Sequence, residues 1–166
     1  NVYTGNLGGG SNMSISRLFI PFDTSTLPDD AIISAATITL TCSGVTGAST
    51  FHAVESTQAD PTSLANGDFD AITGATGSMT SLGSVVINST GAKVITLNAT
   101  GLALISKTGY SKFAVAEDHD VTNSDPGLAS DYRVSINTSD NGTAGNRPTL
   151  DITYEVPSGG FYYMSV

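Results

Sequence analysis

The side chains best suited to binding an ion lie in one acidic segment, residues 117–126 (EDHDVTNSDP). Calcium takes several oxygen ligands from carboxylates, amides and backbone carbonyls. The segment offers Asp118, Asp120, Asn123 and Asp125, although the glycine and the bidentate glutamate of an EF-hand are missing. The alternative is an ordinary turn, because Asx side chains also bond to their own backbone. We expect a calcium ion, if one binds, to order the loop without performing chemistry.

Hydrolytic chemistry has little support in the sequence. A catalytic triad needs a nucleophile, a base within hydrogen-bond reach and an orienting group. His52 and His119 are the only histidines, and no G-x-S-x-G motif occurs. His52 lies in an alternating segment that is typical of a strand, which favours a packed or solvent-facing role. His119, flanked by two aspartates, is expected to be a hydrogen-bonded loop histidine, with a metal ligand or a pH-sensitive contact as the alternative.

Other enzyme classes are disfavoured as well. A glycosidase needs two neighbouring carboxylates, and nothing in the sequence marks two of Glu55, Glu117 and Glu155 as neighbours. There is no P-loop, no G-x-G-x-x-G after a predicted strand, and no Cys/His cluster for zinc. The sequence therefore predicts a non-catalytic protein, with calcium as the one cofactor to consider.

The composition narrows the class of partner and the setting. Fifteen acidic and six basic residues give a net charge of −9, which disfavours nucleic acid and anionic bilayers as partners. No apolar run is long enough to cross a membrane, so membrane insertion is not expected. Charged residues make up only 13% of the 166 residues, and Ser, Thr, Gly and Asn replace them. This composition excludes a coiled coil and favours an extracellular or virion-surface location.

Apolar and polar residues alternate with period two along most of the chain, which is the pattern of half-buried strands. The predicted strands cover residues 14–23, 36–42, 50–56, 84–88, 93–98, 112–117, 132–137 and 149–156. Pro21 cannot donate a ladder hydrogen bond, so the first of these strands belongs at a sheet edge or at a bulge. One short helix is expected near residues 100–107. The predicted fold is all-β: a single antiparallel β-sandwich of jelly-roll or Greek-key type with about eight strands.

Two features fit the alternating pattern less well. Residues 57–83 are nearly patternless, so they hold either a short strand near residues 69–72 or a surface loop with a task. The single cysteine, Cys42, falls in an alternating apolar segment, which predicts a small buried hydrophobe. An intermolecular bridge or a reactive thiol is the alternative for Cys42.

The chain ends flank the predicted sandwich of residues 14–156. Residues 1–13 are Gly-rich with a possible β-segment at 2–4, and residues 157–166 (PSGGFYYMSV) place an apolar run after a Pro-Ser-Gly-Gly hinge. An apolar tail needs a surface to cover it, either on its own domain or, by strand addition, on a neighbouring subunit. The predicted assembly contacts are Val2, Tyr3, Phe161, Tyr162, Tyr163, Met164 and Val166.

Several stretches together carry a resemblance to a known family. They are residues 17–23 (RLFIPFD), 34–38 (SAATI), 97–102 (LNATGL), 113–121 (FAVAEDHDV) and 147–154 (RPTLDITY). In this order they resemble the DNRLRE-type β-sandwich modules of bacterial secreted and cell-wall proteins and of bacteriophage structural proteins. The resemblance implies a mostly non-catalytic module, in many cases adhesive or carbohydrate-binding. Family modules carry a further N-terminal strand, so its absence here would leave an open sheet edge that invites strand addition.

Five N-x-S/T sequons permit glycosylation in a suitable host, at Asn12, Asn88, Asn98, Asn137 and Asn141. Taken together, the residues predict a structural subunit of a virion surface or extracellular filament. The subunit would bind copies of itself or a capsid or surface lattice through its termini and sheet edges. A carbohydrate-binding, adhesive module with the same fold is the alternative, with glycans as its ligands.

Overall fold

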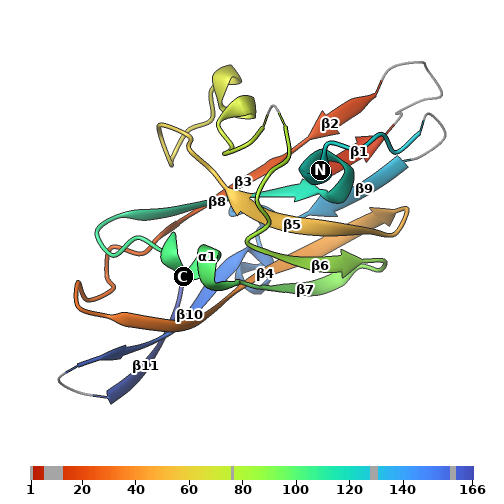
Figure 1. Cartoon of the computed structure of the whole chain (residues 1–166). Helices are drawn as coiled ribbons and strands as arrows, with labels where there is room; N and C mark the ends of the chain where they lie inside the picture. The colour runs from red at the N-terminus through yellow and green to blue at the C-terminus, as the bar shows by residue number, and fades with distance from the viewer. Residues whose placement is uncertain (1, 6–12, 76, 128–130, 158–159) are drawn as a thin grey trace.

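The structure, a computed structural model, describes residues 2–5, 13–75, 77–127, 131–157 and 160–166. Its strands form two antiparallel sheets that pack face to face (Figure 1). The first sheet has the order β11 (Gly160–Ser165), β10 (Thr149–Val156), β4 (Ile32–Thr46), β9 (Asp131–Ile136), β1 (Val2–Gly5) and β2 (Ser14–Ser16), with β7 (Gly91–Thr96) also paired to β4. The second sheet has the order β3 (Leu18–Asp23), β8 (Tyr110–Glu117), β5 (Ser49–Glu55) and β6 (Gly83–Ile87).

The predicted all-β sandwich is confirmed. Each of the eight predicted segments contains strand, and residues 149–156 match β10 at both bounds. The chain passes repeatedly between the two sheets, as a Greek-key sandwich does. The predicted helix is shorter than expected, because α1 covers only Ala99–Ala103. Its N-cap is Asn98, whose side-chain oxygen accepts a hydrogen bond from the Gly101 amide.

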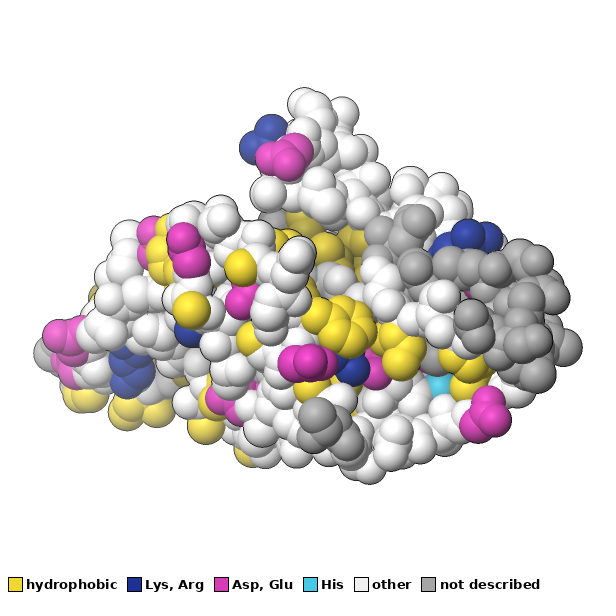
Figure 2. Space-filling view, turned by 90° about the horizontal axis from the view of Figure 1, so that it is seen from above, with side chains coloured by type: hydrophobic (Ala, Val, Ile, Leu, Met, Phe, Trp, Pro, Cys, Tyr) yellow, Lys and Arg dark blue, Asp and Glu magenta, His cyan; other side chains and the backbone are white. Residues whose placement is uncertain are grey.

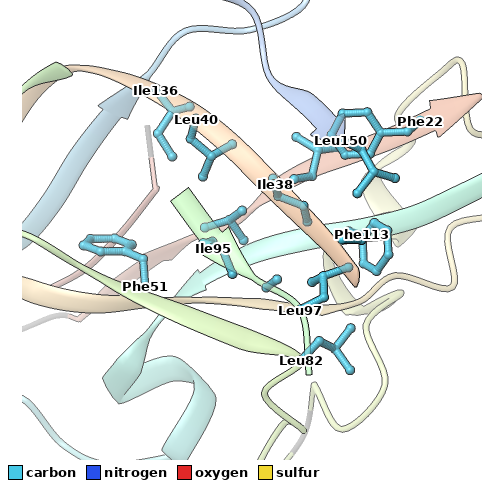
Figure 3. Close-up of a cluster of buried hydrophobic side chains, with 14 of the residues drawn as sticks. Phe22, Ile38, Leu40, Phe51, Leu82, Ile95, Leu97, Phe113, Ile136 and Leu150 are labelled. Atoms are coloured by element: carbon cyan, nitrogen blue, oxygen red, sulfur yellow. The ribbon is translucent and has the colours of Figure 1, made fainter. Parts of the chain in front are cut away.

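The core lies between the sheets and is centred on the long strand β4. Its alternating residues Ile38, Leu40 and Cys42 point into the core, whereas the threonines between them are half-buried. Phe51 and Phe113 reach the same core from the second sheet (Figure 3). The expectation that Cys42 is buried is confirmed, and burial raises the pKa of its thiol. Where β6 begins, a Cβ on Gly83 would lie 2.2 Å from the Thr96 carbonyl oxygen, so only glycine lets the two sheets approach there.

The first predicted strand divides at Arg17. Residues before it form β2 at an edge of the first sheet, and residues after it form β3 at an edge of the second sheet. The edge position predicted from Pro21 is therefore confirmed. A proline on this strand leaves a gap in the row of backbone donors that β3 offers to a further strand.

Residues 57–82 cover the outer face of the second sheet. They form one 3-10 helix, η1 (Asn66–Asp70), and a single bridge between Ser56 and Ile72 instead of a strand. Beneath them lies a small second core of Val54, Ile72, Met79, Ala114, Ala116 and Val121. Strand β8 is consequently buried on both faces. The remaining helices are α2 (Asp118–Thr122) and the 3-10 helix η2 (Ala144–Asn146).

The two ends of the chain belong to the first sheet. Strand β1 pairs with β9 and β2, and Val2 is 0% exposed. Val2 packs in the core of its own chain, so the prediction that it forms an assembly contact is wrong. The possible β-segment at residues 2–4 is confirmed as part of β1, so a strand occupies the position whose absence would have left an open edge. The backbone of Tyr3 pairs in β1, but its side chain lies outside the described residues.

No helix within the described ranges is long and apolar enough to span a membrane.

Candidate functional site

Arg17, at the division between β2 and β3, binds two separate parts of the chain. Its Nε and Nη2 donate to the two carboxylate oxygens of Asp120 in α2, at 2.8 and 2.7 Å. Its Nη1 donates to the Phe69 carbonyl at 2.7 Å, and the guanidinium lies 4.3 Å from the centre of the Phe69 ring. The Arg17 and Asp120 side chains are only 3% and 5% exposed. This is a buried bidentate ion pair whose charges are already neutralised, so it fastens α2 and the 57–82 segment to the sheets.

His52 on β5 connects Ser81 to Asp118. Its Nδ1 lies 2.8 Å from the Ser81 hydroxyl, and its Nε2 lies 2.9 Å from Asp118 Oδ1. In the neutral ring the carboxylate favours a proton on Nε2, which leaves Nδ1 to accept from the serine. This is the hydrogen-bond order of a nucleophile, a base and an orienting group. No local sequence pattern indicates this arrangement, because the three residues come from separate segments.

Ser81 is held by a second contact besides the one to His52. The hollows described below, along β3 and elsewhere among the described residues, are lined by other side chains than His52, Ser81 and Asp118. The backbone carbonyl of Ser81 accepts a hydrogen bond from Asn98, so both ends of the residue are held. The chain of hydrogen bonds therefore ties the segment before β6 to β5 and to α2.

Glu117 organises a second polar centre at the end of β8. Its carboxylate is fully buried and accepts hydrogen bonds from the Ser49 hydroxyl and from Nδ1 of His119, the latter at 2.8 Å. It also caps α2 by accepting from the His119 amide. The His119 ring stacks on Tyr132 at a centroid distance of 4.8 Å. Because the carboxylate stands between the serine and the histidine, the histidine does not activate the serine. The expectation of a hydrogen-bonded His119 is confirmed.

The predicted calcium ligands do not converge. Asp118 binds His52, and Asp120 binds Arg17. Asn123 ends α2 in the left-handed conformation, and Asp125 accepts from the Gly127 amide. Within the described residues no group of three or more His, Cys, Asp or Glu side chains is placed to hold a metal ion. The acidic segment forms a capped helical turn, close to the alternative that the sequence left open.

The apolar tail packs on its own domain as strand β11, yet it leaves aromatic side chains outside. Met164 and Val166 pack against the core, whereas Phe161 and Tyr163 are 79% and 67% exposed. Tyr162 stacks on Tyr154 of β10 and is about half exposed. The β10–β11 hairpin projects from the body of the sandwich (Figure 1). One face of the tail therefore packs on its own domain, and the other face is exposed and available to a neighbouring subunit.

The backbone of β11 is paired on one side only, since β11 is the terminal strand of its sheet. Val166 and Leu150 exchange two hydrogen bonds, of 2.6 and 3.0 Å. Because such bonded pairs alternate along antiparallel strands, the backbone groups of Tyr162 and Met164 also face β10. Those of Phe161, Tyr163 and Ser165 point away from the sheet. The segment 160–166 contains no charged residue and no proline, so it lacks the usual protection of an edge strand.

A groove of about 590 Å³ runs along β3, an edge strand of the second sheet. All six residues of β3 line it, together with Pro61, Thr62, Tyr110, Thr138, Ser139, Pro148 and Val166. Its rim contains Asp23, and hydrogen bonds from Ser25 lower the pKa of that carboxyl. The groove combines apolar walls with hydroxyl groups and one exposed carboxylate.

Four of the five sequon asparagines lie within the described residues. Asn88 is exposed between β6 and β7, whereas Asn98, also exposed, caps α1 and donates to the Ser81 carbonyl. Asn141 accepts from the Thr143 amide. Asn137 is half-buried at the end of β9, and Asn12 lies outside the described residues. Asn88 and Asn98 are thus the two exposed acceptors among the described residues.

Searches of family models, curated proteins and solved structures find no match to this chain. The DNRLRE resemblance therefore stays a prediction.

Proposed function

We propose that this chain is a non-catalytic structural subunit of an extracellular or virion-surface assembly, joined to its neighbours through strand β11. The observation that carries the proposal is the pair of exposed aromatic side chains, Phe161 and Tyr163, on an edge strand without charge or proline. Backbone groups at such an edge are a template for a strand from another chain.

The rest of the molecule supports a mechanical role. The buried ionic groups of Arg17, Glu117 and Asp120 are all bound within the chain. On the face in Figure 2, charged side chains are scattered and form no large patch of one sign. A sandwich whose residues are only 13% charged and rich in Ser, Thr and Asn suits a subunit exposed outside a cell or on a particle. The localisation is part of the same proposal.

The assembly role is tested by putting charges on β11. We expect the double variant Phe161→Lys/Tyr163→Lys to fold and to lose self-association in sedimentation velocity and ordered assemblies in electron micrographs. The matched control is Val86→Lys/Val94→Lys, which changes two exposed apolar residues on β6 and β7. Equal assembly by wild type and the β11 variant would contradict the proposal, as would equal loss in the control.

The absence of catalysis is tested at Ser81. Its hydroxyl is bonded to His52, so it is the serine whose environment most resembles an activated nucleophile. We expect a fluorophosphonate probe to label the folded protein no faster than the Ser81→Ala variant, as read by mass spectrometry. Selective labelling that requires both Ser81 and His52 would overturn the non-catalytic assignment.

Glycan binding is the second candidate, and the groove along β3 is the observation that favours it. Its wall includes Tyr110, which is partly exposed, beside the hydroxyls of Thr62 and Thr138. An aromatic face beside polar groups is a common form of ligand site. A glycan array on wild type and Tyr110→Ala tests it, with Tyr132→Ala as the control because Tyr132 is stacked on His119 outside the groove. Glycan binding that survives Tyr110→Ala would exclude this groove.

A further inference from the structure

Strand β11 offers its free edge in a pattern that is complementary to itself. The outward backbone groups belong to Phe161, Tyr163 and Ser165, which are evenly spaced about Tyr163. When a second β11 runs antiparallel with Tyr163 opposite Tyr163, Phe161 faces Ser165 of the other copy at each end. All three pairs are then bonded pairs, and each exchanges two hydrogen bonds. If the register shifts by two residues in either direction, one of the three outward residues no longer faces Phe161, Tyr163 or Ser165 of the second copy.

The side chains are compatible with that register. Phe161, Tyr163 and Ser165 share the outer face of the sheet, opposite to Met164 and Val166. The central tyrosines would become cross-strand neighbours, and each phenylalanine would lie beside a small serine. Aromatic pairs at this position stabilise antiparallel strands. The hydroxyl of Tyr163 is held by Asp151 at 2.5 Å, which keeps the nearest carboxylate engaged within its own chain.

The charge distribution is compatible with contact between copies at this edge. The chain carries a net charge of −9, so two copies repel one another over most of their surface. The segment 160–166 is uncharged. Strand β3, an edge strand of the second sheet, is less suitable for this contact, since Pro21 has no amide proton to offer.

We propose that β11 pairs antiparallel with β11 of a second copy about a two-fold axis at Tyr163, which joins two first sheets into one continuous sheet. This inference rests on the proposed assembly function and specifies its partner and register. The two exposed rings expose roughly 200–350 Å² per copy, given about 150–250 Å² for a whole aromatic side chain. That area lies below the roughly 1,200 Å² total of stable interfaces, so the isolated pair is weak and gains strength from repeated contacts in an assembly.

Cysteine cross-linking tests the register. Cys42 is 2% exposed, so an introduced surface cysteine is the reactive thiol. In the proposed register, Tyr163→Cys places two Cα atoms about 5.5 Å apart, within the usual disulfide range. Phe161→Cys and Ser165→Cys cross-link only when the two variants are mixed. Each alone would hold its thiols roughly 13 Å apart, four residues along the strand.

We expect disulfide-linked dimers from Tyr163→Cys and from the Phe161→Cys/Ser165→Cys mixture, at yields at least tenfold above the collisional control Thr90→Cys. Circular dichroism of each variant checks that it folds, and Ser165→Cys leaves the Tyr163–Asp151 hydrogen bond in place. Control-level yields from both preparations would overturn the inference, as would efficient dimers from Phe161→Cys alone.

The assembly experiment separates failure of this inference from failure of the proposed function. Control-level cross-linking together with loss of native assembly in Phe161→Lys/Tyr163→Lys would mean that β11 docks on a different chain; the function would stand and the two-fold pairing would be wrong. Control-level cross-linking together with unchanged assembly would overturn both.

Discussion

Hydrogen-bonding groups are paired within the chain in the polar centre around α2 (the α2 centre: Arg17, Glu117, His119 and Asp120), whereas β11 has backbone groups at a free edge of its sheet. Around α2, buried charges meet partners from distant parts of the chain, as Arg17 and Asp120 do across 103 residues. On β11, a row of backbone groups and two aromatic rings face solvent. The difference teaches where to look for function. The charged side chains around α2 hold the fold, whereas the surface proposed for a partner consists of polar backbone groups at a free edge and two exposed aromatic rings.

The largest expected effect comes from breaking the buried ion pair. Arg17→Ala leaves the Asp120 carboxylate buried without its cation, which costs about 3–5 kcal/mol of folding free energy. It also removes the hydrogen bond to the Phe69 carbonyl. Chemical denaturation measures the loss. The control Lys93→Ala, whose amine bonds Ser89 at the surface, should change stability by less than about 0.5 kcal/mol. Equal effects of the two variants would contradict the role assigned to the Arg17 centre.

Substitutions on the two faces of β11 should affect different properties. Those on the face that packs against the core should reduce stability, and those on the exposed outer row should reduce self-association. Met164→Ala removes a side chain packed against the core and should cost about 1–3 kcal/mol. Phe161→Ser, on the outer row, should change the unfolding free energy by under about 0.5 kcal/mol while it weakens self-association. Denaturation and sedimentation on the same samples make the comparison. A large stability loss from Phe161→Ser would show that its ring packs within the chain.

The hydrogen-bond chain through His52 should contribute less than the ion pair. His52→Ala removes two hydrogen bonds at a partly buried site, for about 1–2 kcal/mol, and Ser81→Ala removes one, for about 0.5–1 kcal/mol. Thermal unfolding of the two variants, with the exposed Thr80→Ala as control, measures this order. A Ser81→Ala variant that is less stable than His52→Ala would reverse the assignment of His52 as the connecting residue.

Features that repeat along a local segment could be predicted from the sequence, whereas contacts between residues far apart in the chain could not. Period-two alternation predicted β10 and the core face of β4, because burial repeats along each strand. The ion pair of Arg17 and the chain through His52 could not be predicted, since tertiary packing brings those residues together. The five-residue helix α2 is too short to show a helical period. One local pattern does indicate a tertiary contact. The apolar run 113–116 is typical of a strand buried on both faces, and such a strand needs a segment such as residues 57–82 packed on its outer face.

The tail shows the same limit on prediction from sequence. Its apolar composition predicted that some surface must cover it, and β10 covers one row of its side chains. The choice between its own domain and a neighbour depends on whether an edge of β10 is free, and no local pattern encodes that. The prediction that Val2 forms an assembly contact rests on its position near a chain end. Its burial instead follows from the pairing of β1 with β9.

Alkaline pH should affect β11 through the phenol of Tyr163. The hydrogen bond from Tyr163 to Asp151 raises the pKa of the phenol above its usual 10.0, because a phenolate cannot donate to the carboxylate. A raised pKa in the folded state means that the contribution to stability is complete below pH 10 and is lost as pH rises through the raised value. We expect self-association to weaken over that interval in wild type. Tyr163→Phe should lack this alkaline step, and an unchanged step in Tyr163→Phe would assign it to other groups.

The smallest expected effect is that of calcium. A cation at α2 would have to compete with Arg17 for Asp120 and with His52 for Asp118, and both pairs are formed already. We therefore expect a few millimolar calcium to shift Tm by less than about 1 °C, matching magnesium, because a ligand stabilises only in proportion to its binding to the folded state. A calcium-specific rise of several degrees that is reversed by a chelator would show that the acidic segment rearranges around the ion. In that case the α2 centre, like β11, would hold a site for an external partner, and the contrast between the two regions would no longer stand.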